Sequence, residues 1–228
     1  MQQYQWQILQ LGGLPLRPDG SYEEQTLYCC TSTLVWPADS APSPHNTLLT
    51  DPCLIGPDYR TSIKTLEAIG HQIPHIGQYF VTHPHFDHVP AYATPEHSLV
   101  GKPFFPTDNS LRLVHCPGHE AMLRAITFHD TEDRHVWIVG DAVLNEVWLR
   151  AWGYYWPNGY SPSEVAETWR SVANICAEAD IIIPGHGEAI IVTQELLETL
   201  IQGFPQASYA AACPEVAEVL AVRLSKFK

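Results

Sequence analysis

Short apolar runs rich in β-branched and aromatic residues recur along the chain, and they predict β-strands. The double glycine at residues 12–13 and the proline-rich stretch at residues 37–44 interrupt these runs and predict turns or loops. The expected strands cover residues 5–11, 26–36, 47–50, 76–82, 111–116, 124–129, 136–139 and 181–183.

Apolar residues at helical spacing predict four helices between and after these strands. In the clearest of them, Ser161 and Glu164 have the spacing of a capping box, and Val165, Trp169 and Val172 form an apolar stripe. The expected helices cover residues 58–69, 161–179, 194–202 and 214–226.

The composition narrows the class of protein. The 228 residues are 45% hydrophobic and 16% charged, and no repeat or change of composition marks a boundary, so we expect one domain over residues 1–228. The formal net charge is −13 and no basic run occurs, which disfavours nucleic acid as a partner. We see neither a secretory signal pattern nor an apolar stretch that could span a bilayer, so we expect a cytoplasmic protein with no membrane partner and with buried, unpaired thiols.

Four metal-binding side chains fall within six positions, because residues 83–88 read His-Pro-His-Phe-Asp-His. In an extended chain His83, His85 and Asp87 project to the same side. His88 points away from this row, so we expect it to serve a second ion. Imidazole and carboxylate ligands suit Zn²⁺ and Fe²⁺. So short a run cannot complete two coordination spheres, and further ligands must come from elsewhere in the chain.

Further motifs follow this histidine cluster in a definite order. A Pro-Gly-His ends at His119, a Gly-Asp ends at Asp141, and a Gly-His-Gly is centred on His186. Earlier in the chain, Asp51 closes the run Leu-Leu-Thr. Together with the histidine cluster, this ordered set resembles the metallo-β-lactamase superfamily over residues 51–187, and its ligands are similar to those of glyoxalase II.

The resemblance implies an α/β fold, the four-layer αββα sandwich, in which two mixed sheets are flanked by helices and a dinuclear metal site lies at one edge. Asp141 would bridge the two ions. Asp51 would support a metal-binding histidine from behind, although an Asp-Pro turn starter also accounts for this residue. The resemblance also implies that the first ion would be held by His83, His85 and His119. The second ion would be held by Asp87, His88 and His186.

The implied activity is hydrolysis of a small ester, thioester, lactone or amide. One ion would polarise the substrate carbonyl, and a hydroxide shared by both ions would attack it. Asp87 and Asp141 are the expected catalytic carboxylates, Asp141 by holding the ions together and Asp87 by orienting the hydroxide or carrying its proton. The expected cofactors are two divalent metal ions, zinc first, with iron and manganese also compatible. The expected partner is a small-molecule substrate.

Other activities built on the same motifs stay open. Persulfide dioxygenases resemble this motif set but hold one iron with two histidines and one aspartate, so the sequence does not separate them from hydrolases. A phosphodiesterase or nuclease of the same fold is a third alternative. β-Lactam hydrolysis is disfavoured because true enzymes of that type lack the bridging aspartate, here Asp141, or use a cysteine ligand. A glutathione thioester is disfavoured because Arg223, Lys226 and Lys228 are the only cations after Gly187.

A segment rich in aromatic residues, 148–160, follows the Asp141 motif. One interpretation is a hydrophobic wall or lid over the metals, in which a tyrosine hydroxyl donates a hydrogen bond to a developing oxyanion. The other is core packing or a subunit contact, which is compatible with a homodimer. The side chains expected to form the substrate pocket are Trp152, Tyr154, Tyr155, Trp156 and Tyr160.

Overall fold

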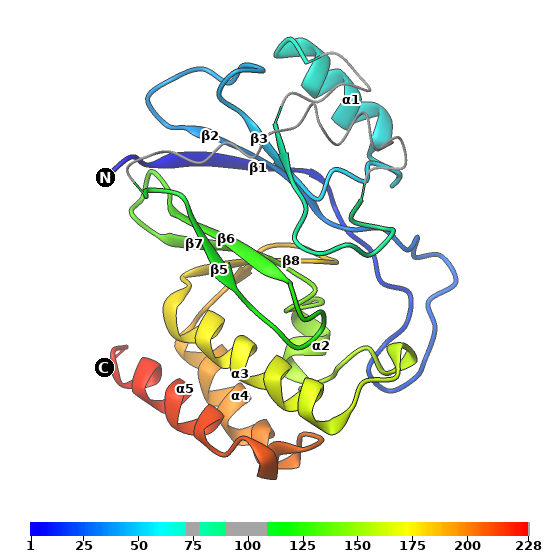
Figure 1. Cartoon of the computed structure of the whole chain (residues 1–228), viewed down its shortest axis with the longest axis vertical. Helices are drawn as coiled ribbons and strands as arrows, with labels where there is room; N and C mark the ends of the chain where they lie inside the picture. Colours follow the sequence, from blue (N-terminus) through cyan, green and yellow to red (C-terminus); the bar gives the residue numbers. More distant parts are fainter. Residues whose placement is uncertain (72–77, 90–108, 228) are drawn as a thin grey trace.

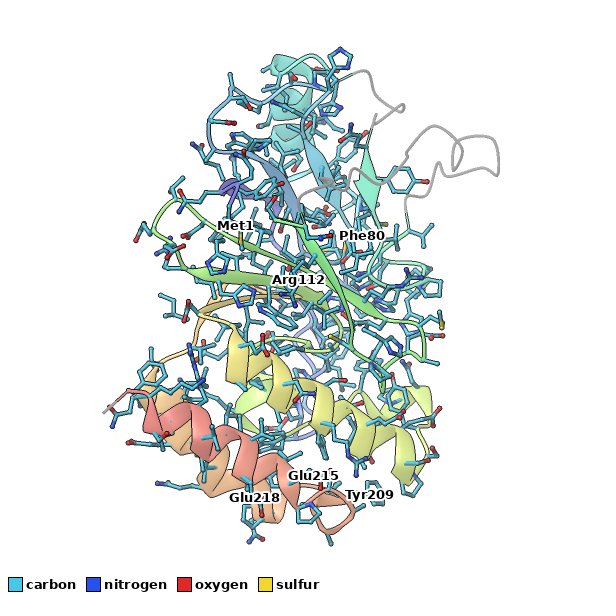
Figure 2. All side chains as sticks on the ribbon, turned by 60° about the vertical axis from the view of Figure 1, so that its left-hand side comes forward. Met1, Phe80, Arg112, Tyr209, Glu215 and Glu218 are labelled. Carbon is cyan, nitrogen blue, oxygen red and sulfur yellow. The ribbon has the colours of Figure 1, made fainter. Side chains whose placement is uncertain are left out.

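Two mixed β-sheets pack face to face, and helices cover both outer faces (Figure 1). The structure is a computed structural model that describes residues 1–71, 78–89 and 109–227. Its layers follow the order helix, sheet, sheet, helices, which confirms the αββα sandwich predicted from the sequence. Side chains fill the spaces between these layers, as Figure 2 shows.

The first sheet comes from the N-terminal part of the chain. In spatial order its strands are β1 (Tyr4–Gln10), β2 (Ser32–Pro37), β3 (Leu48–Thr50) and β4 (Tyr79–Phe80). The pair β3 and β4 is parallel, whereas the other neighbours are antiparallel. Helix α1 (Tyr59–Ala68) packs on the outer face, where Leu34, Leu49 and Leu66 share one buried cluster.

The second sheet comes from the C-terminal part. In spatial order its strands are β5 (Arg112–His115), β6 (Arg124–His129), β7 (His135–Gly140), β8 (Ile181–Pro184) and β9 (Ile190–Ile191). Only β7 and β8 form a parallel pair among these strands. The helices after β7 are α2 (Glu146–Arg150), α3 (Pro162–Glu178), α4 (Gln194–Gly203) and α5 (Glu215–Ser225). None of the described helices is long and apolar enough to cross a membrane.

Strand β7 shows why the chain builds layers on both sides of a sheet. Val136 and Ile138 are buried in the cluster between the two sheets, while Trp137 and Val139 are buried in the cluster beneath α3, α4 and α5. Successive side chains of a strand point to opposite faces, so an uninterrupted apolar run must be covered on both. This double burial makes β7 a rigid base for the loop that follows it.

Helix α3 begins at the predicted capping box. The Ser161 side chain accepts a hydrogen bond from the Glu164 backbone N–H, and the Glu164 carboxylate accepts one from the Ser161 backbone N–H. The predicted apolar stripe is buried, with Val165 and Trp169 packed toward the second sheet. Such reciprocal capping fixes where a helix starts, and here it holds Ser161, the residue that follows Tyr160.

The structure differs from the sequence prediction in four segments. Residues 26–31 do not form a strand, because Thr31 bonds across to the loop after β8: its N–H donates to the Gly185 carbonyl at 2.6 Å. Helix α2 and strand β9 were not predicted, and both are too short to show a period. Of the predicted strand 76–82, residues 76–77 lie outside the described residues, and β4 covers two of the others.

Candidate metal centre

The candidate ligands lie on loops that leave the carboxyl ends of strands. Asp51 directly follows β3 and His83 follows β4, which are parallel neighbours. Asp141 directly follows β7 and His186 follows β8, the other parallel pair. The carboxyl ends of parallel neighbours meet at one edge of a sheet, and loops on such a rigid frame commonly carry binding sites. The fold thereby brings residues from distant parts of the sequence to one place.

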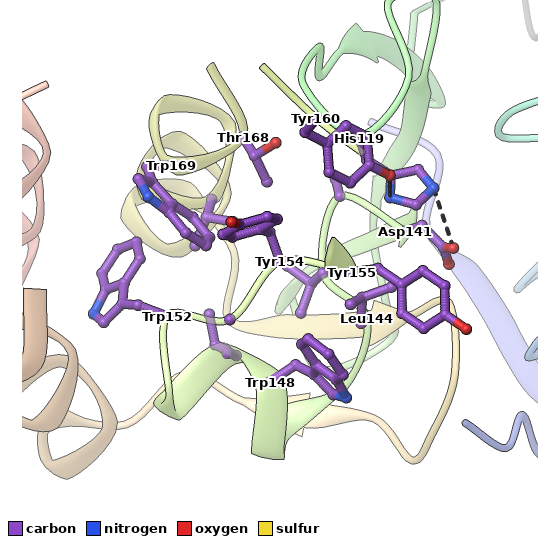
Figure 3. A pocket seen from close by; sticks show the side chains of 15 residues that line it. His119, Asp141, Leu144, Trp148, Trp152, Tyr154, Tyr155, Tyr160, Thr168 and Trp169 are labelled. Atoms are coloured by element: carbon purple, nitrogen blue, oxygen red, sulfur yellow. Dashed lines mark hydrogen bonds and ion pairs between the residues drawn. The ribbon is translucent and has the colours of Figure 1, made fainter. Parts of the chain in front are cut away.

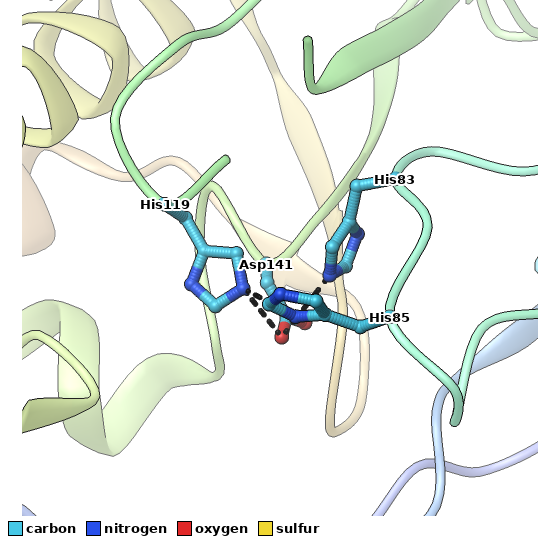
Figure 4. Close-up of side chains that lie close together, drawn as sticks. All are labelled: His83, His85, His119 and Asp141. Atoms are coloured by element: carbon cyan, nitrogen blue, oxygen red, sulfur yellow. Dashed lines mark hydrogen bonds and ion pairs between the residues drawn. The ribbon is translucent and has the colours of Figure 1, made fainter. Parts of the chain in front are cut away.

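The seven predicted ligands form two groups. In each group one nitrogen or oxygen atom from every residue lies within 4.8 Å of the others. The first group is drawn in Figure 4. We call these the first group, His83, His85, His119 and Asp141, and the second group, Asp87, His88 and His186.

Asp141 lies between the two groups with one carboxylate oxygen toward each. Its Oδ2 is 3.3 Å from His119 Nε2 and 3.7 Å from His83 Nε2. Its Oδ1 is 3.2 Å from both His88 Nε2 and His186 Nε2. A carboxylate in this position can contact two cations at once, which is the bridging arrangement that the sequence predicts.

The local backbone differs from the extended row predicted for residues 83–88. The N–H groups of His88 and Val89 both donate to the His85 carbonyl, at 3.0 and 3.2 Å, so the chain turns after His85. The turn carries Asp87 away from His83 and His85 and places it with His88 and His186. The prediction that Asp87 shares a direction with the first two histidines was therefore wrong.

Asp51 supports both groups from behind. Its Oδ2 lies 3.0 Å from His88 Nδ1, and its carboxylate accepts hydrogen bonds from the Thr82 backbone N–H at 2.7 Å and from the Thr82 hydroxyl at 2.9 Å. The Thr82 oxygen in turn contacts His83 Nδ1 at 3.1 Å. Asp51 has a positive φ of 43°, so it is also a turn residue. The two interpretations of Asp51 from sequence are therefore compatible.

Two more histidines are held in orientation by contacts at Nδ1, the ring nitrogen that points away from the centre. His119 Nδ1 contacts the Tyr160 hydroxyl at 2.9 Å, and His186 Nδ1 contacts the Cys29 carbonyl at 2.9 Å. Partners of this kind fix the tautomer and the ring orientation of a metal-binding histidine, and they leave Nε2 free to bind. His85 differs, since its Nδ1 faces the group, 3.1 Å from His119 Nε2.

Burial and neighbouring charges set the protonation of the centre. Burial lowers the pKa of His83 to about 2 and that of His119 to about 4, so both rings are neutral near pH 7. Burial also opposes charge on His88, but Asp51 and Asp141 outweigh it and raise the pKa of His88 well above its usual value. The pKa of His186 is raised too, by Asp141 against the effect of burial.

Several buried polar atoms of the centre have no hydrogen-bond partner. They all belong to the predicted ligands, and they are His83 Nε2, both Asp87 oxygens, both ring nitrogens of His88, Asp141 Oδ1 and His186 Nε2. His88 Nδ1 still has Asp51 Oδ2 as an ion-pair partner at 3.0 Å, so the atoms that face the centre are the ones left without a partner. Buried polar atoms are almost always paired, so a converging set of unpaired ones calls for an explanation. A divalent cation accepts lone pairs from imidazole and carboxylate. The donor set therefore fits a divalent-metal centre.

The glycines of the ligand motifs allow this close packing. Gly140, which precedes Asp141, has a φ of +50°, and a side chain there would collide with Thr82. Gly185, which precedes His186, leaves no room for a Cβ beside the Asp141 carboxylate. Both positions require glycine for reasons of space, which explains the Gly-Asp and Gly-His pairs in the sequence.

The aromatic segment is divided between the core and the site (Figure 3). Trp152 is buried; its Nε1 donates to the Leu200 carbonyl at 2.9 Å, and its ring packs against Trp169. It still borders a narrow cavity that reaches His119 and Asp141, which we call the aromatic cavity. The other predicted pocket residues on this cavity are Tyr154, Tyr155 and Tyr160, whereas Trp156 is half exposed and borders a separate hollow.

A second, larger hollow also borders His119. We call it the polar hollow; it has a volume of about 380 Å³ and is lined by residues that include His85, His119, Glu120, Asn158, Tyr160 and Glu167. Small-molecule sites commonly have volumes of roughly 300–1,000 Å³. The polar hollow is therefore large enough for a small substrate, and it touches the first group.

Sequence reasoning missed three contributors to the centre. Thr82 and the Cys29 carbonyl orient ligands, and the Tyr28 ring lies 5.3 Å from the His186 ring. Burial, followed by the charges of Asp87 and Asp141, raises the pKa of Tyr28. Thr82 could have been suspected from its place next to His83, but a backbone carbonyl carries no signal in a sequence.

No protein-family model matches the sequence, and the search of curated proteins finds no match. Solved structures do match. A probable metal-dependent hydrolase from Staphylococcus aureus is 12% identical, with a TM-score of 0.59 and coverage of 86% of this chain and 95% of that one. The DIM-1 metallo-β-lactamase is 13% identical, with a TM-score of 0.53 and coverage of 90% and 99%. The BLEG-1 B3 metallo-β-lactamase is 14% identical, with a TM-score of 0.50 and coverage of 84% and 96%.

Proposed function

We propose that this chain, which has the metallo-β-lactamase fold, is a metal-dependent hydrolase that uses two divalent ions to cleave a small ester, thioester, lactone or amide. The observation that carries the proposal is Asp141, whose two oxygens face two separate groups of candidate ligands. We expect zinc, and iron or manganese would be compatible with the same ligands.

Each candidate ligand has a role in this proposal. His83, His85 and His119 would hold one ion, Asp87, His88 and His186 would hold the other, and Asp141 would contact both. When bound, such ions polarise carbonyl oxygens and lower the pKa of water. Asp87 is buried with both of its oxygens unpaired, so it can accept a hydrogen bond or a proton at the second group.

The surroundings of the centre favour a small molecule as substrate. The polar hollow is bordered by Glu120, Glu164 and Glu167, and no lysine or arginine is among the described residues that line it. The whole chain also carries a formal net charge of −13. Nucleic-acid binding depends on cationic side chains that neutralise phosphates, so a long nucleic acid is not the proposed substrate.

A substrate panel on zinc-loaded protein tests the proposal. It contains a nitrophenyl ester, an aryl thioester, a lactone, an anilide, a β-lactam and bis-nitrophenyl phosphate, and metal-stripped protein is the control. We expect metal-dependent turnover of at least one ester, thioester, lactone or amide. Cleavage of the phosphodiester alone would point to a phosphodiesterase instead. Oxygen uptake with a persulfide by protein that holds one iron would point to a dioxygenase.

A further inference from the structure

The polar hollow combines a wall of the candidate centre with a set of negative charges. His85 and His119, two members of the first group, line it, and so do the carboxylate residues Glu120, Glu164 and Glu167. Glu164 and Glu167 are three positions apart on α3, so they lie on the same side of the helix. A molecule that fills the hollow therefore contacts the candidate ligands and the carboxylates together.

No described side chain neutralises this charge. None of the three carboxylates forms an ion pair within the described part of the chain. Arg170 follows Glu167 by one turn of α3, but its Nε donates to Glu215 at 2.6 Å and its Nη2 donates to the Ala212 carbonyl at 2.9 Å. Like charges around one hollow repel each other, and a cation between them relieves this repulsion. The hollow is therefore complementary to positive charge.

The spacing of the carboxylates fits an organic cation and not a bare metal ion. Among the described residues, ligand atoms of three or more residues come within 4.8 Å of one another only in the first and second groups. The glutamates of the hollow do not form a third such group, so they cannot close around an ion as oxygen ligands do. The volume of about 380 Å³ has room for an ammonium group with its substituents and for the rest of a small molecule.

We propose that the substrate of this chain carries a positively charged ammonium group, which the polar hollow holds near Glu120, Glu164 and Glu167 while the scissile carbonyl lies at the first group. This inference rests on the proposed hydrolase function and narrows its substrates to cationic esters, thioesters, lactones or amides. In the hydrolysis, the oxygen of one water joins the carbonyl carbon, the bond from that carbon to the leaving group breaks, and the leaving group takes a proton. The ammonium group is unchanged.

Matched substrates test the requirement for charge. Acetylthiocholine is compared with 3,3-dimethylbutyl thioacetate, which has the same shape without the charge. The nitrophenyl esters of betaine and of 3,3-dimethylbutanoic acid form a second pair, with the cation on the acyl side. Each kcat/KM is divided by the rate of spontaneous hydrolysis. We expect at least one pair to favour the cation about tenfold or more, and added salt to reduce the preference. Equal values in both pairs would overturn the proposal.

A double variant locates the preference in the hollow. Glu120→Gln with Glu167→Gln removes two of its carboxylates, and Glu164 is kept because its carboxylate also caps α3. The matched control, Glu198→Gln with Glu218→Gln, removes two exposed carboxylates that do not border the hollow. We expect the ratio of cationic to neutral kcat/KM to fall about fivefold or more in the first variant, since an exposed ion pair contributes roughly two- to fivefold. An equal fall in the control would show that net charge attracts the cation, and would contradict the proposal.

A binding measurement provides a readout that does not depend on turnover. Calorimetry compares trifluoroacetophenone with a meta trimethylammonium group and the same ketone with a meta tert-butyl group. We expect the cationic ketone to bind about tenfold more tightly to the parent protein, and the double variant of the hollow to lose most of this difference. Equal binding of the two ketones to the parent would contradict the proposal.

The outcomes separate this inference from the proposed function. If the parent protein hydrolyses neither these pairs nor any ester, thioester, lactone or amide of the panel, the proposed function fails. If it hydrolyses neutral substrates as well as it hydrolyses their cationic partners, the proposed function holds and only the present inference fails.

Discussion

The two groups of the candidate centre differ in how the protein encloses them. The second group is closed, because Asp87 and His88 are fully buried and His186 is 2% exposed. The first group lies at the edge of the polar hollow through His85 and His119. Under the proposed function, substrate would therefore approach the first group, whereas the second group is held within the protein. Asp141, a member of the first group, also contacts the second, and Asp51 makes contacts that reach ligands of both.

The change that should affect both groups most is Asp141→Ala. It removes the carboxylate between them and takes from the buried rings of His88 and His186 the negative partner that lies 3.2 Å from each. We expect activity to fall by at least about 1,000-fold, as when one member of a set of cooperating catalytic groups is removed. The measurement is turnover together with metal content by mass spectrometry. Retention of full activity by folded protein would show that Asp141 does not join the two groups.

Single-histidine variants separate the groups. We expect His85→Ala to weaken the first site and His88→Ala to weaken the second, so each variant should retain about one ion per chain under conditions that give two in the parent. His129→Ala, which changes a histidine outside both groups, is the control. If either single variant lost both ions, the groups would form one indivisible site rather than two.

The groups should also differ in the pH dependence of metal binding. His88 and His186 have raised pKa values without metal, so their protons must leave when an ion binds, whereas His83 and His119 have lowered values and are already neutral. Binding to the second group should therefore weaken as pH falls, about tenfold per pH unit for each proton released. Calorimetry in buffers of different ionisation enthalpy counts the protons. Equal proton release at both sites would contradict the comparison.

We expect Asp51→Asn to lower metal affinity at both groups, by less than Asp141→Ala does. Asparagine tolerates the positive φ of this position, but its amide cannot accept from both Thr82 and His88 as the carboxylate does. We expect metal affinity to fall about 10–100-fold at both groups, the usual effect of losing a contact behind a ligand. Chelator competition measures it. A loss confined to the second group would show that the path through Thr82 to His83 is unimportant.

Much of the fold follows from local sequence patterns. Strand β6 and helix α3 were predicted closely because their apolar residues are buried in the way that the pattern requires, and because the Ser161 capping box marks the start of the helix. Residues 26–31 were predicted wrongly because their β-rich composition does not reveal that Thr31 bonds to Gly185 and Gly187 instead of a neighbouring strand. The conformation of residues 26–31 therefore depends on contacts with a loop that is distant in the sequence.

The sequence predicts the candidate ligands of the centre better than it predicts the residues that contact those ligands. The seven candidate ligands could be named because their motifs, in order, resemble those of the metallo-β-lactamase superfamily, and their binding of metal stays a prediction. The outer contacts could not be assigned, since Tyr160 was one of several aromatic candidates and Cys29 acts through its backbone carbonyl. The prediction that Asp87 shares a direction with His83 and His85 failed because the hydrogen bonds to the His85 carbonyl depend on the folded loop.

The most direct test of the account is the metal content of the protein after purification without added metal and again after loading with zinc and removal of the excess. Because Asp141 directs one oxygen toward each group, we predict two divalent ions per chain in the loaded protein and one or fewer in Asp141→Ala. A loaded protein that holds no ion, or only one while all seven ligands are intact, would contradict the two-group centre.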